Sequence, residues 1–343
     1  AHDEEVLLPR LLASARAADY PADRLDIHVV ADNCTDRTAE VAREGGARVY
    51  ERVDDDERGK GYALRWLLGR IDEAGERYDA FVVVDADSII ARDFFGRMDA
   101  RLEAGSAVIQ AYYTVLNVGE SPLAALRYAA LTAVHYLRPL GRAALGLSCG
   151  LKGNGMCFAA PVLERLGWSW FTLAEDVEFH LALVERGIRV DFAYETTVMA
   201  DMPVSFRQAV IQNTRWERGR VEMLRRYGPR LVADALRERS FLRLDAVIEQ
   251  LIPPLSVPFA LAGGLLLVGV GLRRMLPTLL AIFGLGGQVV YLLAALRLAR
   301  APSRAYRALA YAPPYIAWKV ALYGRALVAR GALPWQRTKR ILG

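Results

Sequence analysis

The sequence predicts an α/β domain built on a mostly parallel, mixed sheet and followed by C-terminal membrane helices. Apolar, β-branched runs alternate with helical segments through the first half of the chain, and two later runs carry no charged residue. With 343 residues, the chain can form one large domain or two ordinary ones. Three cysteines and four histidines, none at zinc-ligand spacing, exclude a disulfide scaffold and argue against a structural zinc site.

Strands are predicted where apolar, β-branched residues cluster, and helices fill the segments between them. The predicted strands are Leu25–Ala31, Ala47–Tyr50 and Ala80–Val84, and the predicted helices are Thr35–Glu44 and Tyr62–Ile71. This alternation predicts a mostly parallel sheet that is covered on both faces. Ligands of such sheets bind at the carboxyl ends of strands, so polar residues at those ends are the first candidates for a site.

Carboxylates stand at two of these strand ends. Asp32 ends the first strand and could accept the imide N–H of a uracil ring, while Thr35 or Asp36 is expected to cap the following helix. Asp85 and Asp87 follow the third strand, and in an extended segment both carboxylates would face the same way. Two negative charges so near each other are unfavourable unless a cation offsets them, which favours a bound Mg²⁺ or Mn²⁺. The alternative is that this acidic turn only caps a helix.

The segment Arg58-Gly59-Lys60-Gly61 precedes a predicted helix. It lacks the spacing of a P-loop, but glycines on both sides of a lysine suit close approach to a pyrophosphate. A flexible turn with a solvated lysine is the equal alternative.

A helix that ends near Gly187 opens with Thr172-Leu173-Ala174-Glu175-Asp176. Thr172 and Glu175 fit a capping box, which leaves Asp176 available as a general base for an attacking hydroxyl. Because a helix N-terminus lowers a carboxyl pKa, such a base would also need a dry pocket.

The run Gln212-Asn213-Thr214-Arg215-Trp216 lies in a predicted helix over Phe206–Tyr227. Gln212, Arg215 and Trp216 share a helix face. Trp216 is either a core residue covered by a cation or a platform for a sugar ring, with Arg215 gripping phosphate.

These motifs occur in one order: Ala1-His2-Asp3-Glu4-Glu5, Asp32, Gly59-Lys60-Gly61, Asp85-Ala86-Asp87, Glu175-Asp176 and Gln212-x-x-Arg215-Trp216. The set resembles the membrane-integrated inverting glycosyltransferases of family 2, the group that contains cellulose, chitin and hyaluronan synthases. The segments Val29–Asp36, Gln110–Tyr113 and Gly146–Phe158 are most similar to a bacterial exopolysaccharide-biosynthesis branch. Asp3 departs from the family, where asparagine is commoner, and no C-terminal gating segment of the cellulose synthase kind is recognisable.

The resemblance implies a GT-A fold that binds a nucleotide-sugar donor together with Mg²⁺ or Mn²⁺. The donor-binding residues that it implies are Ala1, Glu4, Asp32, Lys60, Asp85, Gln212 and Arg215. Among them, Ala1, Glu4 and Asp32 would hold uridine, and Lys60 would lie near the diphosphate. Asp87 would ligate the metal, with Asp85 as the second carboxylate.

The resemblance also implies the catalytic and acceptor residues. Asp176 would be the catalytic base, and the acceptor would meet Trp216, Asn154 and Glu175. The implied activity is transfer of a sugar, from a UDP-hexose or UDP-N-acetylhexosamine, to a membrane-associated or lipid-linked glycan in exopolysaccharide synthesis. A polyprenyl-phosphate glycosyltransferase and a non-catalytic nucleotide-sugar-binding subunit are the alternatives.

The C-terminal third predicts a membrane anchor. Residues 230–343 hold 16 basic and 4 acidic residues, and the runs Gln250–Leu272 and Met275–Leu296 are free of charge. A buried hairpin in a soluble core is the alternative. Arginines flank the outer ends of the two runs, which predicts that the N-terminal domain lies in the cytoplasm. The resemblance implies that the membrane is a bacterial inner membrane. Because the basic residues punctuate apolar runs, the charge pattern argues for a lipid bilayer as partner and against nucleic acid.

The expected domain order follows from these features. Residues 1–229 form the catalytic domain, expected to lack its first strand because the chain opens like a loop that leaves one. An amphipathic connector (230–249) and two transmembrane helices (250–297) follow, and residues 298–343 form a third transmembrane or interfacial helix with a basic tail. Other polysaccharide-assembly proteins are possible partners.

Overall fold

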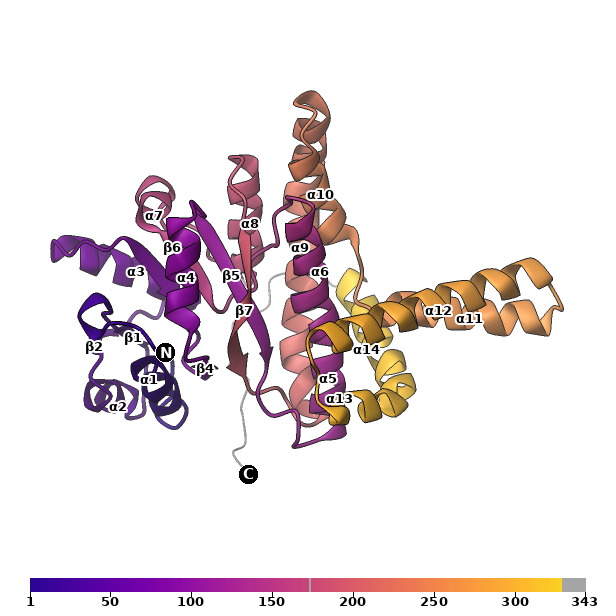
Figure 1. Ribbon diagram of the computed structural model, residues 1–343, viewed down its shortest axis with the longest axis horizontal. Helices are drawn as coiled ribbons and strands as arrows, with labels where there is room; N and C mark the ends of the chain where they lie inside the picture. Colours follow the sequence, from indigo (N-terminus) through magenta and orange to yellow (C-terminus); the bar gives the residue numbers. More distant parts are fainter. Residues whose placement is uncertain (173, 329–343) are drawn as a thin grey trace. The chain divides into compact units, whose positions relative to one another are not determined.

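A computed structural model gives the structure of residues 1–172 and 174–328 (Figure 1). Within these ranges, the side chains that it does not describe are those of Arg207, Gln208, Ile211, Arg215, Ala326 and Leu327. The chain divides into two compact units. The first unit comprises Ala1–Thr114 and Pro139–Asp201, and the second comprises Val115–Arg138 and Met202–Gly343. The domain boundaries predicted at residues 229, 249 and 297 stay predictions.

The first unit contains the alternating segments that the sequence predicts. Its strands are β1 (His28–Asp32), β2 (Arg48–Arg52), β3 (Ala80–Val83), β4 (Ser88–Ile90), β5 (Val108–Val115, whose last residue belongs to the second unit), β6 (Met156–Ala159) and β7 (Asp191–Ala200). Its helices are α1 (Leu8–Arg16), α2 (Thr38–Glu44), α3 (Lys60–Glu73), α4 (Phe94–Glu103), α7 (Ala160–Leu166) and α8 (Glu175–Glu185). Strands β1 to β3 and helices α2, α3 and α8 confirm the predicted elements to within a few residues at each end.

The strand pairing corrects the predicted sheet. β1 and β2 pair in parallel, but β3 pairs with β6, β5 with β6 and β4 with β7 in antiparallel register, within a sheet of order β3-β6-β5-β7-β4. The sheet is therefore mixed, as expected, and the prediction that it is mostly parallel is wrong. The alternation rule applies to strands joined by one helical crossover, whereas β6 inserts between two strands that are distant from it in sequence.

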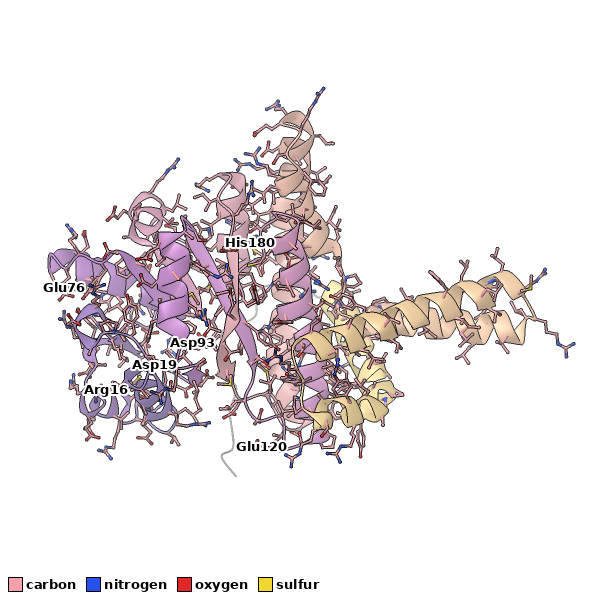
Figure 2. All side chains as sticks on the ribbon, in the orientation of Figure 1. Arg16, Asp19, Glu76, Asp93, Glu120 and His180 are labelled. Atoms are coloured by element: carbon pink, nitrogen blue, oxygen red, sulfur yellow. The ribbon has the colours of Figure 1, made fainter. Side chains whose placement is uncertain are left out.

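An aromatic stack packs α8 onto the sheet. Phe179 of α8 is fully buried, and its ring centroid lies 3.8 Å from that of Trp170 and 5.0 Å from that of Phe158 on β6. Such ring pairs contribute about 0.5–1.5 kcal/mol each beyond the area that they bury. On the same helix, His180 Nε2 hydrogen-bonds Ser148 Oγ at 2.9 Å (His180 is labelled in Figure 2). These contacts fix the position of the α8 N-terminus, where two site carboxylates lie.

The second unit is helical. It contains α5 (Pro122–Thr132), a π-helical turn (Ala133–Leu137), α9 (Phe206–Arg237), α10 (Phe241–Leu251), α11 (Ser256–Gly271), α12 (Met275–Leu298), α13 (Ser303–Ala308) and α14 (Ala312–Val328); α6 (Arg138–Ala144) begins at the boundary between the units. The predicted helix over 206–227 is confirmed, and it continues through Pro229 to Arg237.

Among the described residues, one helix is long and apolar enough to cross a membrane, α12. A second crossing would require α10 and α11 to act as one span, and these two helices bend by 63° at their break. The break contains Pro253 and Pro254, so the charge-free run 250–272 is not one continuous helix. Phe283 in the middle of α12 is 84% exposed, which is not what the alternative of a buried soluble hairpin predicts.

Candidate functional site

Lys60 connects three distant segments of the first unit. Its Nζ donates a hydrogen bond to Asp85 Oδ1 at 2.5 Å and another to the Gly153 carbonyl, and it lies 3.9 Å from Glu175 Oε1. The alternative of a solvated lysine in a flexible turn is therefore wrong. Burial lowers the pKa of Lys60, but Asp85 and Glu175 outweigh it and raise that pKa above its usual value. The ammonium stays charged at neutral pH.

The glycines on either side of Lys60 are required by backbone conformation and by close packing. Gly59 adopts φ +125° as it starts α3, a value that favours glycine. A Cβ on Gly61 would lie 2.2 Å from the Trp170 carbonyl oxygen, so no side chain fits there. The packing of α3 against the loop before α8 thus accounts for Gly61, and the spacing by itself does not require a pyrophosphate.

Asp85 and Asp87 lie on a turn and not on an extended segment. β3 ends at Val83, and the Ser88 N–H donates to the Asp85 carbonyl at 3.1 Å. The premise that alternation along a strand aims both carboxylates at one point is therefore wrong. The Ser88 hydroxyl donates to Asp87 Oδ1 at 3.4 Å. The turn, and not strand geometry, sets the positions of these two carboxylates.

Two side-chain hydrogen bonds from Asn154 hold this turn in place. Its side chain is 1% exposed; its oxygen accepts from the Asp85 N–H at 3.1 Å, and its amide nitrogen donates to Ser88 Oγ at 2.8 Å. These hydrogen bonds give Asn154 a positioning role in this turn, and its predicted contact with an acceptor stays a prediction. Gln110 on β5, also fully buried, donates to the Asn154 carbonyl at 2.7 Å. Gln110 was not predicted to have a role, although a glutamine within a buried apolar strand needs a hydrogen-bond partner and is itself a signal.

The predicted capping box at the start of α8 is not formed. The N-cap residue is Ala174, whose side chain makes no capping hydrogen bond. Thr172 Oγ1 is buried and has no hydrogen-bond partner among the described residues. Glu175 is thus not used as a cap, and its carboxylate faces Lys60 instead.

The two carboxyls at the start of α8 lie in a desolvated environment. Burial raises the pKa of Glu175 to about 7; the nearby charge of Asp176 adds to this effect and Lys60 opposes it. Burial also raises the pKa of Asp176. A Cβ on Gly153, which has φ +78°, would lie 3.3 Å from Asp176 Oδ2, so the loop approaches this carboxylate closely. Glu175 and Asp176 are half-buried, and the raised pKa of Asp176 suits a general base at a helix N-terminus.

The raised pKa of Glu175 predicts a pH dependence of stability. Because the folded state binds this proton more tightly than the unfolded state, folding takes up a proton between an ordinary pKa of 4.5 and about 7, and the contribution of Glu175 to stability falls as the pH rises through this window. We expect Glu175→Gln to show a smaller drop in Tm from about pH 5 to pH 8 than the wild type. Thermal unfolding across this range checks it, with the exposed Glu164→Gln as control. Equal slopes for all three proteins would contradict the shift.

The N-terminal segment lies beside the end of β1. Ala1 N donates to the Val30 carbonyl at 2.7 Å, and Asp32 N donates to the Ala1 carbonyl at 2.8 Å. The Glu4 N–H donates to Thr38 Oγ1 at 2.7 Å. The structure therefore brings together Ala1, Glu4 and Asp32, the set predicted to hold uridine.

Asp32 is paired inside the protein. It is 7% exposed, and Arg52 Nη1 donates to its Oδ1 at 2.7 Å. Arg52 is itself 4% exposed and was not predicted, because it ends the neighbouring parallel strand. Asp36 accepts from the Thr38 N–H at 2.9 Å, so it satisfies a first-turn amide of α2 as expected, although the N-cap residue is Arg37.

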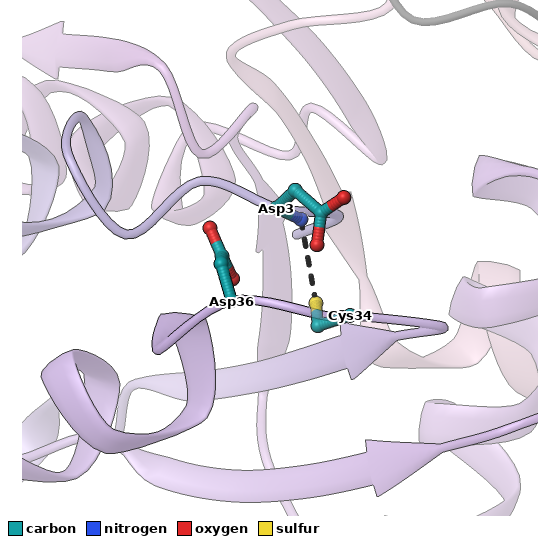
Figure 3. Close-up of side chains that lie close together, drawn as sticks. All are labelled: Asp3, Cys34 and Asp36. Atoms are coloured by element: carbon teal, nitrogen blue, oxygen red, sulfur yellow. Dashed lines mark hydrogen bonds between the residues drawn. The ribbon is translucent and has the colours of Figure 1, made fainter.

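Asp3, Cys34 and Asp36 are close enough to offer one ligand atom each to a metal ion (Figure 3). Their polar atoms already have other partners. Asp3 Oδ1 accepts from the Thr35 N–H at 2.7 Å, Asp36 Oδ2 accepts from the Glu5 N–H at 3.1 Å, and burial raises the pKa of the Cys34 thiol. The group is accounted for as the contact between the N-terminal segment and the loop after β1.

In the second unit, Arg127 contacts both Gln212 and Trp216, and it was not among the predicted site residues. Arg127 of α5 is 2% exposed; its Nη2 donates to Gln212 Oε1 at 2.5 Å, and its guanidinium carbon lies 5.5 Å from the Trp216 ring centroid. The cation over Trp216 is thus Arg127. The side chain of Arg215 lies outside the described part of the chain. A lone arginine in the apolar helix α5 was the available signal.

Comparison with known proteins identifies similar chains. Residues 1–219 match the sequence model of the family described as glycosyltransferase like family 2. The probable glycosyltransferase YdaM of Bacillus subtilis is 25% identical over 228 residues, which are 64% of this chain and 53% of that protein. The beta-monoglucosyldiacylglycerol synthase of Synechocystis is 22% identical over 75% of this chain and 54% of its own length. The chain spans about half the length of these curated relatives.

A solved structure is similar along most of the chain. The mannosyltransferase PcManGT from Pyrobaculum calidifontis, solved in complex with GDP-Man and Mn²⁺, superposes with a TM-score of 0.53 at 17% identity and covers 96% of this chain and 85% of that one. This likeness and the family match confirm the predicted GT-A-like α/β fold with a mixed sheet.

Proposed function

The chain belongs to glycosyltransferase-like family 2, and from this premise we propose that it transfers a sugar, with inversion, from a nucleotide-sugar donor to a membrane-associated glycan. One observation carries the proposal: Lys60 joins Asp85 and Glu175 at one point, next to the loop residue Gly153, which also lies beside Asp176. A cation for a departing diphosphate and a desolvated base for an incoming hydroxyl are the two groups that an inverting displacement requires.

The chemistry follows from these positions. Asp176 accepts the proton of an acceptor hydroxyl as that oxygen attacks the anomeric carbon. The new C–O bond forms while the bond from the anomeric carbon to the diphosphate oxygen breaks, and the nucleoside diphosphate leaves with the bonding electrons. Lys60 places positive charge where negative charge then develops.

The carboxylates of the turn after β3 suit Mg²⁺ or Mn²⁺, which prefer hard oxygen ligands and substrate phosphates. Asp87 is the stronger candidate, because Asp85 is already paired with Lys60, and Ser88 and Asn154 hold the turn in place. When bound, the cation would offset charge on the diphosphate.

A bilayer is the proposed environment of α12 and of the α10–α11 pair. Their apolar side chains are exposed, for example Phe283 and Leu267, and arginines flank the apolar runs. These features support a catalytic unit on the cytoplasmic side of a membrane. The sequence resemblance is the basis for proposing a bacterial inner membrane, a role in exopolysaccharide synthesis, and a UDP-hexose or UDP-N-acetylhexosamine as donor.

The test is to incubate membranes that contain the protein with radiolabelled UDP- and GDP-sugars and Mn²⁺, and then to size the products. We expect label in a large, water-soluble or membrane-retained glycan. Label confined to a lipid extract with one sugar per molecule would instead indicate a polyprenyl-phosphate or other lipid acceptor. Nucleotide-sugar binding without any transfer would contradict the proposal and favour a binding subunit.

Replacing Trp216 distinguishes a sugar platform from a core residue. We expect Trp216→Ala to keep its Tm and donor affinity but to lose transfer by at least about tenfold, and Trp216→Phe to be partly active because it keeps an aromatic face. Trp170→Ala is the control for a core residue. Trp170 is 7% exposed, and truncating it should cost about 3–5 kcal/mol and all activities together. If Trp216→Ala loses stability and all activities as Trp170→Ala does, Trp216 is a core residue and not a sugar platform.

A further inference from the structure

A buried ion pair joins α14 to α9 within the second unit. Lys319 Nζ lies 2.8 Å from Glu217 Oε1, and the two side chains are only 8% and 5% exposed. Lys319 also donates to Asn213 Oδ1. Lysine and glutamate are almost never this buried unless they are paired. An edge contact between Phe206 and Trp318, whose ring centroids are 5.1 Å apart, joins the same two helices.

The ion pair lies next to the segment that presents Trp216. Asn213 and Glu217 are four residues apart on α9 and directly follow Gln212 and Trp216, which are also four apart. Arg127 of α5 binds the Gln212–Trp216 row, and Lys319 of α14 binds the neighbouring row. Two cations from different helices therefore hold this turn of α9.

Stability alone does not explain such a pair. Desolvating two charges costs about as much free energy as their attraction returns, and an apolar pair of similar volume is often as stable. In some proteins, a buried polar or ionic group instead fixes a single register between two helices.

We propose that the Glu217–Lys319 pair positions Trp216, so that α14 contributes to acceptor binding through Lys319. The inference rests on the proposed function, because it takes Trp216 as the surface on which the acceptor stacks. Lys319 and Glu217 are positioning residues, since they act on the acceptor through the register of α9.

The experiment compares Lys319→Gln, the reversed pair Glu217→Lys with Lys319→Glu, and Asp234→Asn. Asp234 is the matched control, because it pairs with Arg230 on the same helix and its side chain is 31% exposed, far more than that of Glu217. Octyl β-D-glucoside serves as the acceptor probe, and hydrolysis of the donor by water is measured in parallel. We expect Lys319→Gln to raise the acceptor KM by about tenfold and to leave donor hydrolysis within about twofold. The reversed pair should recover most of the acceptor affinity.

Limited proteolysis supplies a readout that needs no activity. Segment 312–328 should be cut faster in Lys319→Gln than in the wild type or in Asp234→Asn. If the wild type transfers no sugar in the membrane incubation described above, the proposed function fails, whereas equal proteolysis in all variants overturns this inference alone. An unchanged acceptor KM in Lys319→Gln, or equal losses of transfer and hydrolysis, also overturns it.

A further variant keeps the proposal testable if Lys319→Gln folds poorly. Glu217→Met with Lys319→Met removes both charges and should fold. It is expected to bind the acceptor as weakly as Lys319→Gln, and a wild-type acceptor KM in this protein would overturn the proposal.

Discussion

Replacing Asp176 by asparagine is expected to lower kcat by at least about 10²-fold, the low end for loss of a general base, and to leave donor affinity close to that of the wild type. Asparagine has the same shape but cannot accept the hydroxyl proton. Burial raises the pKa of Asp176, and its Oδ2 lies close to the Gly153 position, so the carboxylate is both desolvated and near the loop that Lys60 binds. Single-turnover kinetics with a radiolabelled donor, together with calorimetric titration of UDP, measure the two quantities.

Glu164→Gln is the control for this experiment, because Glu164 is an exposed carboxylate on α7, and this variant should keep wild-type kcat. A protein with Asp176→Asn that loses donor affinity and keeps its turnover rate would show that Asp176 binds the donor or supports the fold. The raised pKa gives a further expectation for the wild type. Because a base must be deprotonated to act, kcat should fall as the pH drops toward the pKa of Asp176.

Local pattern predicted the elements of the fold but not all of their neighbours. β1, β2, α2 and α3 follow from apolar runs and spacing within a few residues, and all lie where the sequence predicts them. The place of β6 between β3 and β5 depends on contacts between segments that are distant in sequence, which no short-range pattern encodes. The antiparallel pairs, and thus the error about the sheet, have this origin.

The candidate site shows the same division. Lys60, Asp85 and Glu175 were each found from local signals, and the structure brings them together. The arginines that hold other predicted residues were not predicted, because each is a buried polar group whose partner comes from another element. Examples are Arg52 with Asp32 in the first unit and Arg127 with Gln212 in the second. The capping box failed for the opposite reason. A local pattern was present at Thr172 and Glu175, but the Glu175 carboxylate faces Lys60.

Metal dependence separates the two groups of carboxylates that could hold a cation. We expect Asp87→Ala to abolish transfer, as chelation with EDTA should do to the wild type, because the cation offsets charge on the leaving diphosphate.

Asp3→Asn should stay active with an unchanged Mn²⁺ requirement, since the Asp3 carboxylate is occupied by the Thr35 N–H and asparagine can accept that hydrogen bond. Electron paramagnetic resonance of Mn²⁺ titrated into each protein with UDP present counts the bound ions without relying on turnover. Asp87→Ala should lose the UDP-dependent Mn²⁺ signal, whereas Asp3→Asn should retain it. Full activity in EDTA would contradict any role of a metal ion in transfer. Loss of the Mn²⁺ signal in Asp3→Asn but not in Asp87→Ala would move the cation to the loop after β1, and the turn held by Asn154 would then serve the donor through Asp85 and Lys60 alone.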